Sequence, residues 1–223
     1  MTLVVAHRGA SAYEVENSLS AFRLAHAMGA EGIELDVHVT ADGVPIVHHD
    51  PVVDGHPIWH TPWPALEEHT LSNGESMPTL AEALEAIDPS LQVFVEVKSL
   101  SPRDDVNLLS VIDRGPAPSQ YQVHAFDHRI VRRLRAHRPT LEAGVLSASY
   151  PVRPLAAALE AGAAVLWQEE TLVDGDLIDL AHAEQIQVFA WTVDDRARMQ
   201  VLSSLGIDAL CTNRPDVARE VLG

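Results

Sequence analysis

Short apolar or β-branched runs alternate with helical patterns along the whole chain. Such alternation is typical of α/β folds that contain a parallel sheet. The apolar runs predict strands over residues 3–6, 32–39, 92–98, 121–124, 143–146, 164–167, 187–191 and 209–212. The segments between them predict helices over residues 18–28, 80–87, 105–114, 128–137, 154–161, 176–183, 197–205 and 216–222. Eight strand–helix repeats are the count of a (β/α)8 TIM barrel, which we expect for this chain.

A turn signal interrupts the repeat after the second predicted strand. The sequence Ala-Asp-Gly at residues 41–43 is typical of a hairpin turn, so we predict that residues 37–40 and 44–48 pair as a hairpin appended to that strand. Residues 50–78 then show no strand pattern and contain five prolines. We expect a short irregular insertion there, lying on the barrel mouth.

Charged residues stand inside two of the predicted strands. Side chains alternate between the two faces of a strand, so Glu34 and Asp36 point the same way and their apolar neighbours point the other way. Glu96 and Lys98 repeat this spacing in the next strand. Two carboxylates side by side on a buried face are costly unless a cation neutralises them. Because the carboxyl ends of TIM-barrel strands share one mouth, we expect these side chains to converge there.

The residue types predict which cation and which ligand this mouth binds. Carboxylates without sulfur and with little imidazole are hard oxygen ligands, which suit Mg²⁺ or Ca²⁺, and also Mn²⁺, better than zinc or copper. Glu34, Asp36 and Glu96 are therefore the candidate metal ligands. Arg8 and Lys98 would place positive charge beside the ion, which suits a bound phosphate. This combination predicts phosphoryl transfer or phosphodiester cleavage.

Two histidines are candidate acid–base catalysts. His7 follows the first predicted strand, and His49 follows the hairpin and directly precedes an aspartate. Since histidine titrates near neutral pH, one ring could take a proton and the other give one on opposite sides of a phosphorus atom. We interpret His48 as a structural partner of His49. Trp191 ends a later strand, where its ring either lines a substrate pocket or fills the top of the barrel.

Nine short motifs follow one another along the chain. The first five are His7-Arg8-Gly9, Glu16-Asn17, Gly32-Ile33-Glu34-Leu35-Asp36-Val37, Thr40-Ala41-Asp42-Gly43 and His49-Asp50. The last four are Pro78-Thr79-Leu80, Glu96-Val97-Lys98, Trp191-Thr192-Val193 and Thr212-Asn213-Arg214-Pro215. In order and spacing these motifs resemble those of the glycerophosphodiester phosphodiesterases. The resemblance covers nearly the whole chain.

The resemblance implies a (β/α)8 barrel with one divalent metal and a role for each matched residue. The implied acid–base pair is His7 and His49, and the implied metal ligands are Glu34, Asp36 and Glu96. The implied phosphate contacts are Arg8 and Lys98. In that family a neighbouring hydroxyl of the glycerol is understood to attack phosphorus, which expels the alcohol and leaves a cyclic phosphate that water opens. The implied products are sn-glycerol 3-phosphate and an alcohol.

The chain departs from the usual family pattern at several positions. Val15 stands in place of a proline, Ala125 in place of a serine and Asn213 in place of an aspartate. An arginine-threonine pair that usually follows the His-Asp motif is absent, and residues 54–57 read Asp-Gly-His-Pro instead. None of these changes removes a candidate ligand or a candidate catalytic histidine. They predict an intact catalytic core with an unusual substrate pocket.

Two further functions fit parts of the sequence. Trp59 and Trp63 in the insertion could form a lid that receives an acyl chain, which would favour a phosphodiesterase acting on lysophospholipids. Alternatively, the changes at Ala125 and Asn213 could mark a barrel that binds phosphate or metal without catalysis. Turnover of soluble diesters, lysolipids or neither would separate the three functions.

The composition limits the partners. The chain has 223 residues and no stretch that resembles a linker, so we expect a single domain over residues 1–223. Because its formal net charge is −17, we expect it to bind a small glycerophosphodiester and neither nucleic acid nor an anionic membrane surface. The single cysteine, Cys211, lies in an apolar run and is expected in the core. The N-terminus lacks a signal-peptide pattern, and we expect a cytoplasmic protein without stable membrane association. No sequence feature specifies an oligomeric state.

Overall fold

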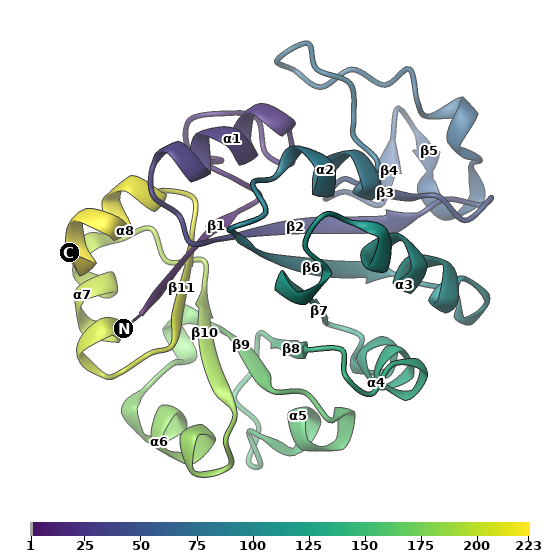
Figure 1. Ribbon diagram of the computed structural model, residues 1–223. Coiled ribbons are helices and arrows are strands. Elements are labelled where there is room, and N and C mark those ends of the chain that lie inside the picture. The colour runs from purple at the N-terminus through teal and green to yellow at the C-terminus, as the bar shows by residue number, and fades with distance from the viewer. Residues whose placement is uncertain (1) are drawn as a thin grey trace.

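The computed structural model describes residues 2–223, which form a closed barrel of parallel strands, each followed by a helix on the outside (Figure 1). The barrel strands are β1 (Leu3–His7), β2 (Gly32–Val39), β6 (Gln92–Ser99), β7 (Tyr121–Ala125), β8 (Ala143–Ser147), β9 (Val165–Glu169), β10 (Gln187–Trp191) and β11 (Ala209–Thr212). The helices are α1 (Leu19–Ala27), α2 (Leu80–Ala86), α3 (Asp105–Arg114), α4 (His128–His137), α5 (Ala156–Ala161), α6 (Gly175–Ala183), α7 (Arg196–Ser204) and α8 (Pro215–Leu222). Within the described residues, none of these helices combines the length and apolar character needed to cross a bilayer.

The strand order confirms the predicted (β/α)8 barrel. Neighbouring strands follow the order β1, β11, β10, β9, β8, β7, β6 and β2, and the ring closes because β2 also pairs with β1. All of these pairs are parallel, so the carboxyl ends of the strands open at one mouth. Three strands and two helices have the predicted bounds, and the others differ by at most two residues at either end.

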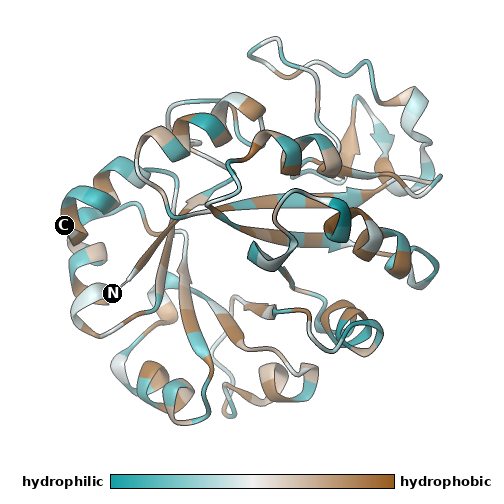
Figure 2. Ribbon diagram, viewed as in Figure 1, coloured by the Kyte–Doolittle hydropathy of each residue, from teal (hydrophilic) through white to brown (hydrophobic). Residues whose placement is uncertain are grey.

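Aromatic side chains fill the interior of the barrel. Phe94, Trp167 and Phe189 are buried and meet edge to face, with ring centroids 4.9 to 5.5 Å apart. Cys211 packs in the same cluster, as expected for a small core residue. A larger apolar layer lies between the strands and the helices, and Figure 2 shows hydrophobic strands surrounded by helices of mixed character. This packing gives the mouth a rigid floor.

The predicted hairpin is present, and the insertion after it is more ordered than we expected. β3 (Pro45–Val47) pairs antiparallel with the end of β2. The following segment contains β4 (Val52–Val53), β5 (His56–Pro57) and two 3₁₀ turns, Ile58–His60 and Trp63–Ala65. Its buried apolar cluster consists of Ile46, Val53, Ile58, Leu66 and Met77. These residues have neither strand nor helix spacing, so the sequence pattern did not reveal that they share a core. In Figure 1 the segment extends from the far end of β2 and β3.

Candidate active site

Four adjacent barrel strands carry polar side chains to the mouth. In the register of the sheet, His7 at the end of β1 stands beside Glu34 on β2, and Asp36 stands beside Glu96 on β6. Glu96 in turn stands beside His124 on β7. Residues that are paired in register lie on the same face of a parallel sheet, which explains why side chains from four separate parts of the sequence meet.

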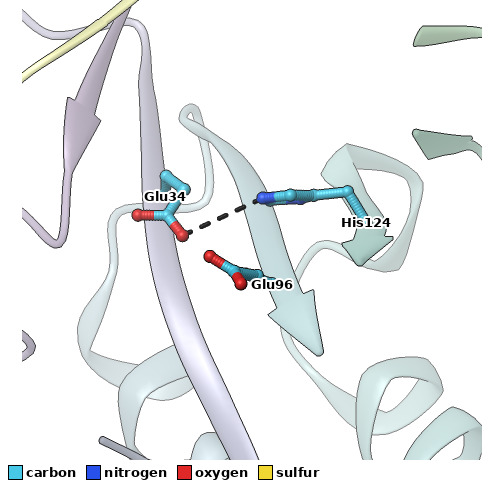
Figure 3. Close-up of side chains that lie close together, drawn as sticks. All are labelled: Glu34, Glu96 and His124. Carbon is cyan, nitrogen blue, oxygen red and sulfur yellow. Dashed lines mark ion pairs between the residues drawn. The ribbon is translucent and has the colours of Figure 1, made fainter. Parts of the chain in front are cut away.

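Glu34, Glu96 and His124 form a compact buried cluster. One ligand atom from each lies within 4.8 Å of the other two, and His124 Nε2 lies 3.9 Å from Glu34 Oε1 (Figure 3). Glu34 Oε1 and His124 Nδ1 are buried and make no hydrogen bond within residues 2–223, whereas Glu96 Oε1 lies 2.8 Å from Lys98 Nζ. Buried carboxylate oxygens without donors are costly, and a divalent cation would satisfy them. The donor set thus fits a metal ion.

The titration of these groups reflects the crowding of negative charge. Burial, followed by the charges of Asp36 and Glu96, raises the pKa of Glu34 well above its usual range. Burial and Asp36 likewise raise the pKa of Glu96 to about 7. Burial lowers the pKa of His124 to about 3, so its imidazole is neutral at pH 7 and has a lone pair for a cation. Its ring stacks on Trp167 with centroids 4.2 Å apart, which fixes its orientation.

Asp36 lies beside this cluster and is bound by cations of the protein itself. Arg8 Nε lies 2.9 Å from Asp36 Oδ2, and Lys98 Nζ lies 3.1 Å from Asp36 Oδ1. The Asn17 side chain donates to Oδ2 at 2.8 Å. Burial opposes ionisation of Asp36, but these two charges and the Asn17 hydrogen bond lower its pKa to about 2. Asp36 therefore anchors both candidate phosphate-binding cations at the mouth.

The His-Arg-Gly motif turns the chain sharply at the end of β1. Arg8 and Gly9 both have positive φ angles, and a Cβ atom at Gly9 would lie 2.6 Å from the backbone of Ala21 on α1. The turn directs Arg8 back toward Asp36, while its Nη1 donates to both carboxylate oxygens of Glu16. Burial and the nearby Arg8 charge lower the pKa of His7, so its ring is neutral at pH 7.

The structure places His49, and not His48, at the same mouth. His49 is about one-third exposed, and its Nδ1 lies 2.8 Å from Asp50 Oδ1. The His49 backbone carbonyl lies 3.1 Å from Nε2 of the buried His38 ring, which fixes the loop to β2. His48 does not line that cavity; it points into a neighbouring groove, which His49 also borders, and there its ring meets His69 edge to face. The geometry is consistent with our choice of His49 as the acid–base candidate.

A single cavity of about 150 Å³ joins these groups. Its polar wall consists of His7, Arg8, Glu34, His49, Glu96, Lys98 and His124. Its apolar wall includes Phe126, Leu146, Trp167 and Trp191. Phe126 and Trp191 meet edge to face at 5.5 Å, and Trp191 Nε1 is buried and makes no hydrogen bond within residues 2–223. Trp191 thus lines the pocket, which was one of the two positions considered for it.

The two tryptophans of the insertion lie elsewhere. Trp59 borders a surface groove with Thr40 and Arg103, and Trp63 packs against the apolar cluster of the insertion. Neither indole lines the cavity at the mouth. Among the described residues these rings do not form a lid over the site. The reason for expecting a lysophospholipid substrate, which was such a lid, is therefore absent.

His124 is the site residue that our sequence reasoning missed. On β7 the side chains of Tyr121, Val123 and Ala125 share one face, so Gln122 and His124 share the other. The alternation that identified Glu34 and Asp36 therefore also applied to His124, but a lone histidine in a short strand is a weaker signal than two carboxylates.

Comparisons with known proteins agree with this geometry. A model of the glycerophosphoryl diester phosphodiesterase family matches residues 7–217. A glycerophosphodiester phosphodiesterase of Caldanaerobacter subterraneus subsp. tengcongensis is 31% identical, with 96% of this chain and 95% of that protein covered. A Mycobacterium tuberculosis protein named probable glycerophosphodiester phosphodiesterase 2 is 30% identical, with 99% of this chain and 90% of that protein covered.

Solved structures show the same fold. The crystal structure of a glycerophosphodiester phosphodiesterase from Parabacteroides distasonis superposes with a TM-score of 0.90 at 25% identity, covering 99% of this chain and 96% of that one. An Oleispira antarctica phosphodiesterase in complex with the product sn-glycerol-3-phosphate gives a TM-score of 0.91 at 22% identity, with 100% and 97% coverage. The chain belongs to the glycerophosphoryl diester phosphodiesterase family and is a phosphoric diester hydrolase that cleaves glycerophosphodiesters.

Proposed function

We propose that residues 1–223 act as a single domain that hydrolyses glycerophosphodiesters to sn-glycerol 3-phosphate and an alcohol, with His7 and His49 as the acid–base pair and one bound divalent cation. The observation that carries the proposal is that both histidines line one cavity with the buried cluster of Glu34, Glu96 and His124. The product complex of the Oleispira antarctica phosphodiesterase supports this choice of product.

Glu34, Asp36 and Glu96 are the proposed oxygen ligands, and the ion is Mg²⁺ or Ca²⁺, with Mn²⁺ a third hard ion of suitable type. All three carboxylates are buried, Glu34 Oε1 has no donor within residues 2–223, and Lys98 Nζ contacts Asp36 Oδ1 and Glu96 Oε1. His124 Nε2 faces Glu34 and would complete the set from the opposite side. When bound, such an ion withdraws electrons from a phosphoryl oxygen and stabilises the negative charge that develops there.

Arg8 and Lys98 are proposed to hold the phosphate. Both line the cavity, and both are oriented by Asp36. In a chain with a net charge of −17 an anionic substrate needs such a local positive site. Trp191 forms part of the facing wall, where its buried Nε1 is proposed to donate to the substrate. The substrate is thus fixed between two cations and an aromatic wall.

The two histidines are proposed to move the protons of the cleavage step. One ring takes the proton from the attacking hydroxyl as its oxygen forms a bond to phosphorus. The other ring gives a proton to the leaving oxygen as its bond to phosphorus breaks, and an alcohol departs. His7 and His49 reach the cavity from the end of β1 and from the loop after β3, which permits action on opposite sides of one phosphorus atom.

We further propose that the enzyme works in the cytoplasm on a small soluble diester, without nucleic acid or stable membrane partners. The acidic composition supports this, because a net charge of −17 is repelled by nucleic acid and by anionic lipid. The cavity of about 150 Å³ also suits a compact polar ligand.

An assay of the metal-depleted protein tests the proposal. Release of glycerol phosphate from glycerophosphocholine and glycerophosphoethanolamine would be measured before and after addition of Mg²⁺, Ca²⁺ or Mn²⁺. We expect negligible release after chelation and recovery with at least one of the three ions. Full activity after exhaustive chelation, or no release with any of them, would reject the proposal.

The affinity for the ion is expected to rise with pH. Glu96 has a pKa of about 7 in the metal-free protein and that of Glu34 is also raised, so both are partly protonated below neutrality and must lose a proton to bind a cation. Titration calorimetry with Mn²⁺ should give a dissociation constant at least about tenfold lower at pH 8 than at pH 6, with release of protons. An affinity that is flat over this range would show that Glu96 does not ligate the ion.

A further inference from the structure

The side chain of Asn213 lies between His7 and an acidic residue outside the cavity. His7 Nδ1 lies 2.7 Å from Asn213 Oδ1, and Asn213 Nδ2 donates to Asp194 Oδ2 at 2.5 Å. His7 ends β1, and Asn213 and Asp194 follow the adjacent strands β11 and β10. The three residues therefore form a chain of hydrogen bonds that leads from His7 away from Glu34 and the rest of the metal cluster.

The contacts of Asp194 settle which way the Asn213 amide points. Asp194 Oδ1 accepts from the Thr212 hydroxyl at 2.9 Å and from the Asn213 backbone N–H at 2.8 Å. An ionised carboxylate can only accept hydrogen bonds, so the amide group that faces Asp194 Oδ2 must be the NH₂ of Asn213. The opposite amide orientation would set two oxygens against each other at 2.5 Å. The amide oxygen must therefore face His7.

This orientation in turn fixes the tautomer of His7. An amide oxygen cannot donate, so His7 Nδ1 must carry the ring proton and donate it to Asn213. In the neutral ring Nε2 is then unprotonated. Nε2 is on the side of Glu34, whose Oε2 lies 4.0 Å away in the wall of the cavity. A histidine in this state is prepared to accept a proton at Nε2.

We propose that Asp194 and Asn213 are positioning residues that hold His7 in the Nδ1–H tautomer, so that its Nε2 faces the reacting groups in the cavity. This inference rests on the proposed function and adds two residues outside the cavity that orient one of its two proton-transfer groups. The Ser11 hydroxyl lies 2.7 Å from both the His7 carbonyl oxygen and Asn213 Oδ1 and can donate its one proton to only one of them at a time. During cleavage the proton that His7 transfers is carried at Nε2, while Nδ1 keeps its own proton, bonded to Asn213.

An exchange of the two side chains is the sharpest test. Asp194→Asn leaves two facing amides, so the orientation of the Asn213 amide is no longer fixed. Asn213→Asp places two carboxylates side by side, which removes the donor between residues 194 and 213. The double variant Asp194→Asn/Asn213→Asp restores one donor and one acceptor, with the acceptor still facing His7. We expect each single variant to lower kcat by at least about tenfold, with KM changed less, and the double variant to exceed both by a similar factor. Asn73→Asp, an exposed change of equal charge, should leave kcat unchanged.

Ring ¹⁵N spectra of histidine report which ring nitrogen of His7 carries the proton. A purely structural role of Asn213 would leave this tautomer unchanged. At pH 8 the wild-type His7 signal, assigned by its loss in His7→Ala, should show the proton on Nδ1. In Asn213→Ala the proton should shift toward Nε2. A wild-type proton on Nε2, or a double variant no better than the single ones, would overturn the inference. If His7→Ala itself retains full activity, the proposed function fails instead.

Discussion

Replacing His7 with alanine is expected to lower kcat on glycerophosphocholine by about 10²–10⁴-fold, the usual contribution of one acid–base group. His49→Ala should cause a loss of the same order. In both variants the fold and the affinity for the metal should stay nearly intact, because neither ring belongs to the cluster of Glu34, Glu96 and His124. Steady-state kinetics together with calorimetric metal titration would measure both effects.

His48→Ala is the matched control, since His48 adjoins His49 in sequence but does not line the cavity at the mouth. It should retain near wild-type kcat. A leaving group that needs no proton separates the two roles: a p-nitrophenyl diester of glycerol phosphate should rescue the variant that lacks the general acid and not the other one. A larger loss for His48→Ala than for His49→Ala would contradict the assignment of His49.

Replacing Glu34 with glutamine is expected to change metal affinity and metal-free stability in opposite directions. Loss of a charged ligand should weaken Mn²⁺ binding by about 10²-fold or more, and Asp36→Asn should weaken it by at least about tenfold. The raised pKa of Glu34 means that its negative charge destabilises the metal-free fold; this cost is absent below the ordinary glutamate pKa, grows as pH rises above it and is complete once pH exceeds the raised value. Metal-free Glu34→Gln should therefore melt at a higher temperature than the metal-free wild type at high pH.

Thermal unfolding with and without ion would check this reversal. Saturating Mn²⁺ should raise the melting temperature of the wild type, since at 100 times Kd a ligand adds about 2.7 kcal/mol. The same ion should barely move Glu34→Gln. At pH 5 the metal-free difference between the two proteins should shrink as Glu34 becomes protonated. Equal ion-induced shifts in both proteins would show that Glu34 does not bind the ion.

The barrel was predictable because each of its strands is an apolar run of ordinary length. Residues inside such a run, such as Glu34 and Glu96, stand out against their neighbours, and period-two alternation places them on one face. The insertion was not predictable in the same way. Its core joins Ile46 and Met77, which are far apart in sequence and belong to no periodic pattern.

The partners of the site residues also required the structure. The sequence paired Arg8 and Lys98 with a phosphate, and in the fold both are held by Asp36. Asn213 was noted only as a departure from the family's usual aspartate. Its meaning depends on Asp194, a residue 19 positions away whose contact with it arises only when β10 and β11 lie side by side.

A crystal structure of the protein soaked with Mn²⁺ and sn-glycerol 3-phosphate, with the ion located by its anomalous scattering, tests the central claim most directly. The account predicts one strong peak coordinated by Glu34, Asp36 and Glu96, with His124 beside it. It also predicts a phosphate held by Arg8 and Lys98 with His7 and His49 on opposite sides of the phosphorus atom. An ion bound away from the two glutamates, or a phosphate out of reach of both histidines, would contradict it.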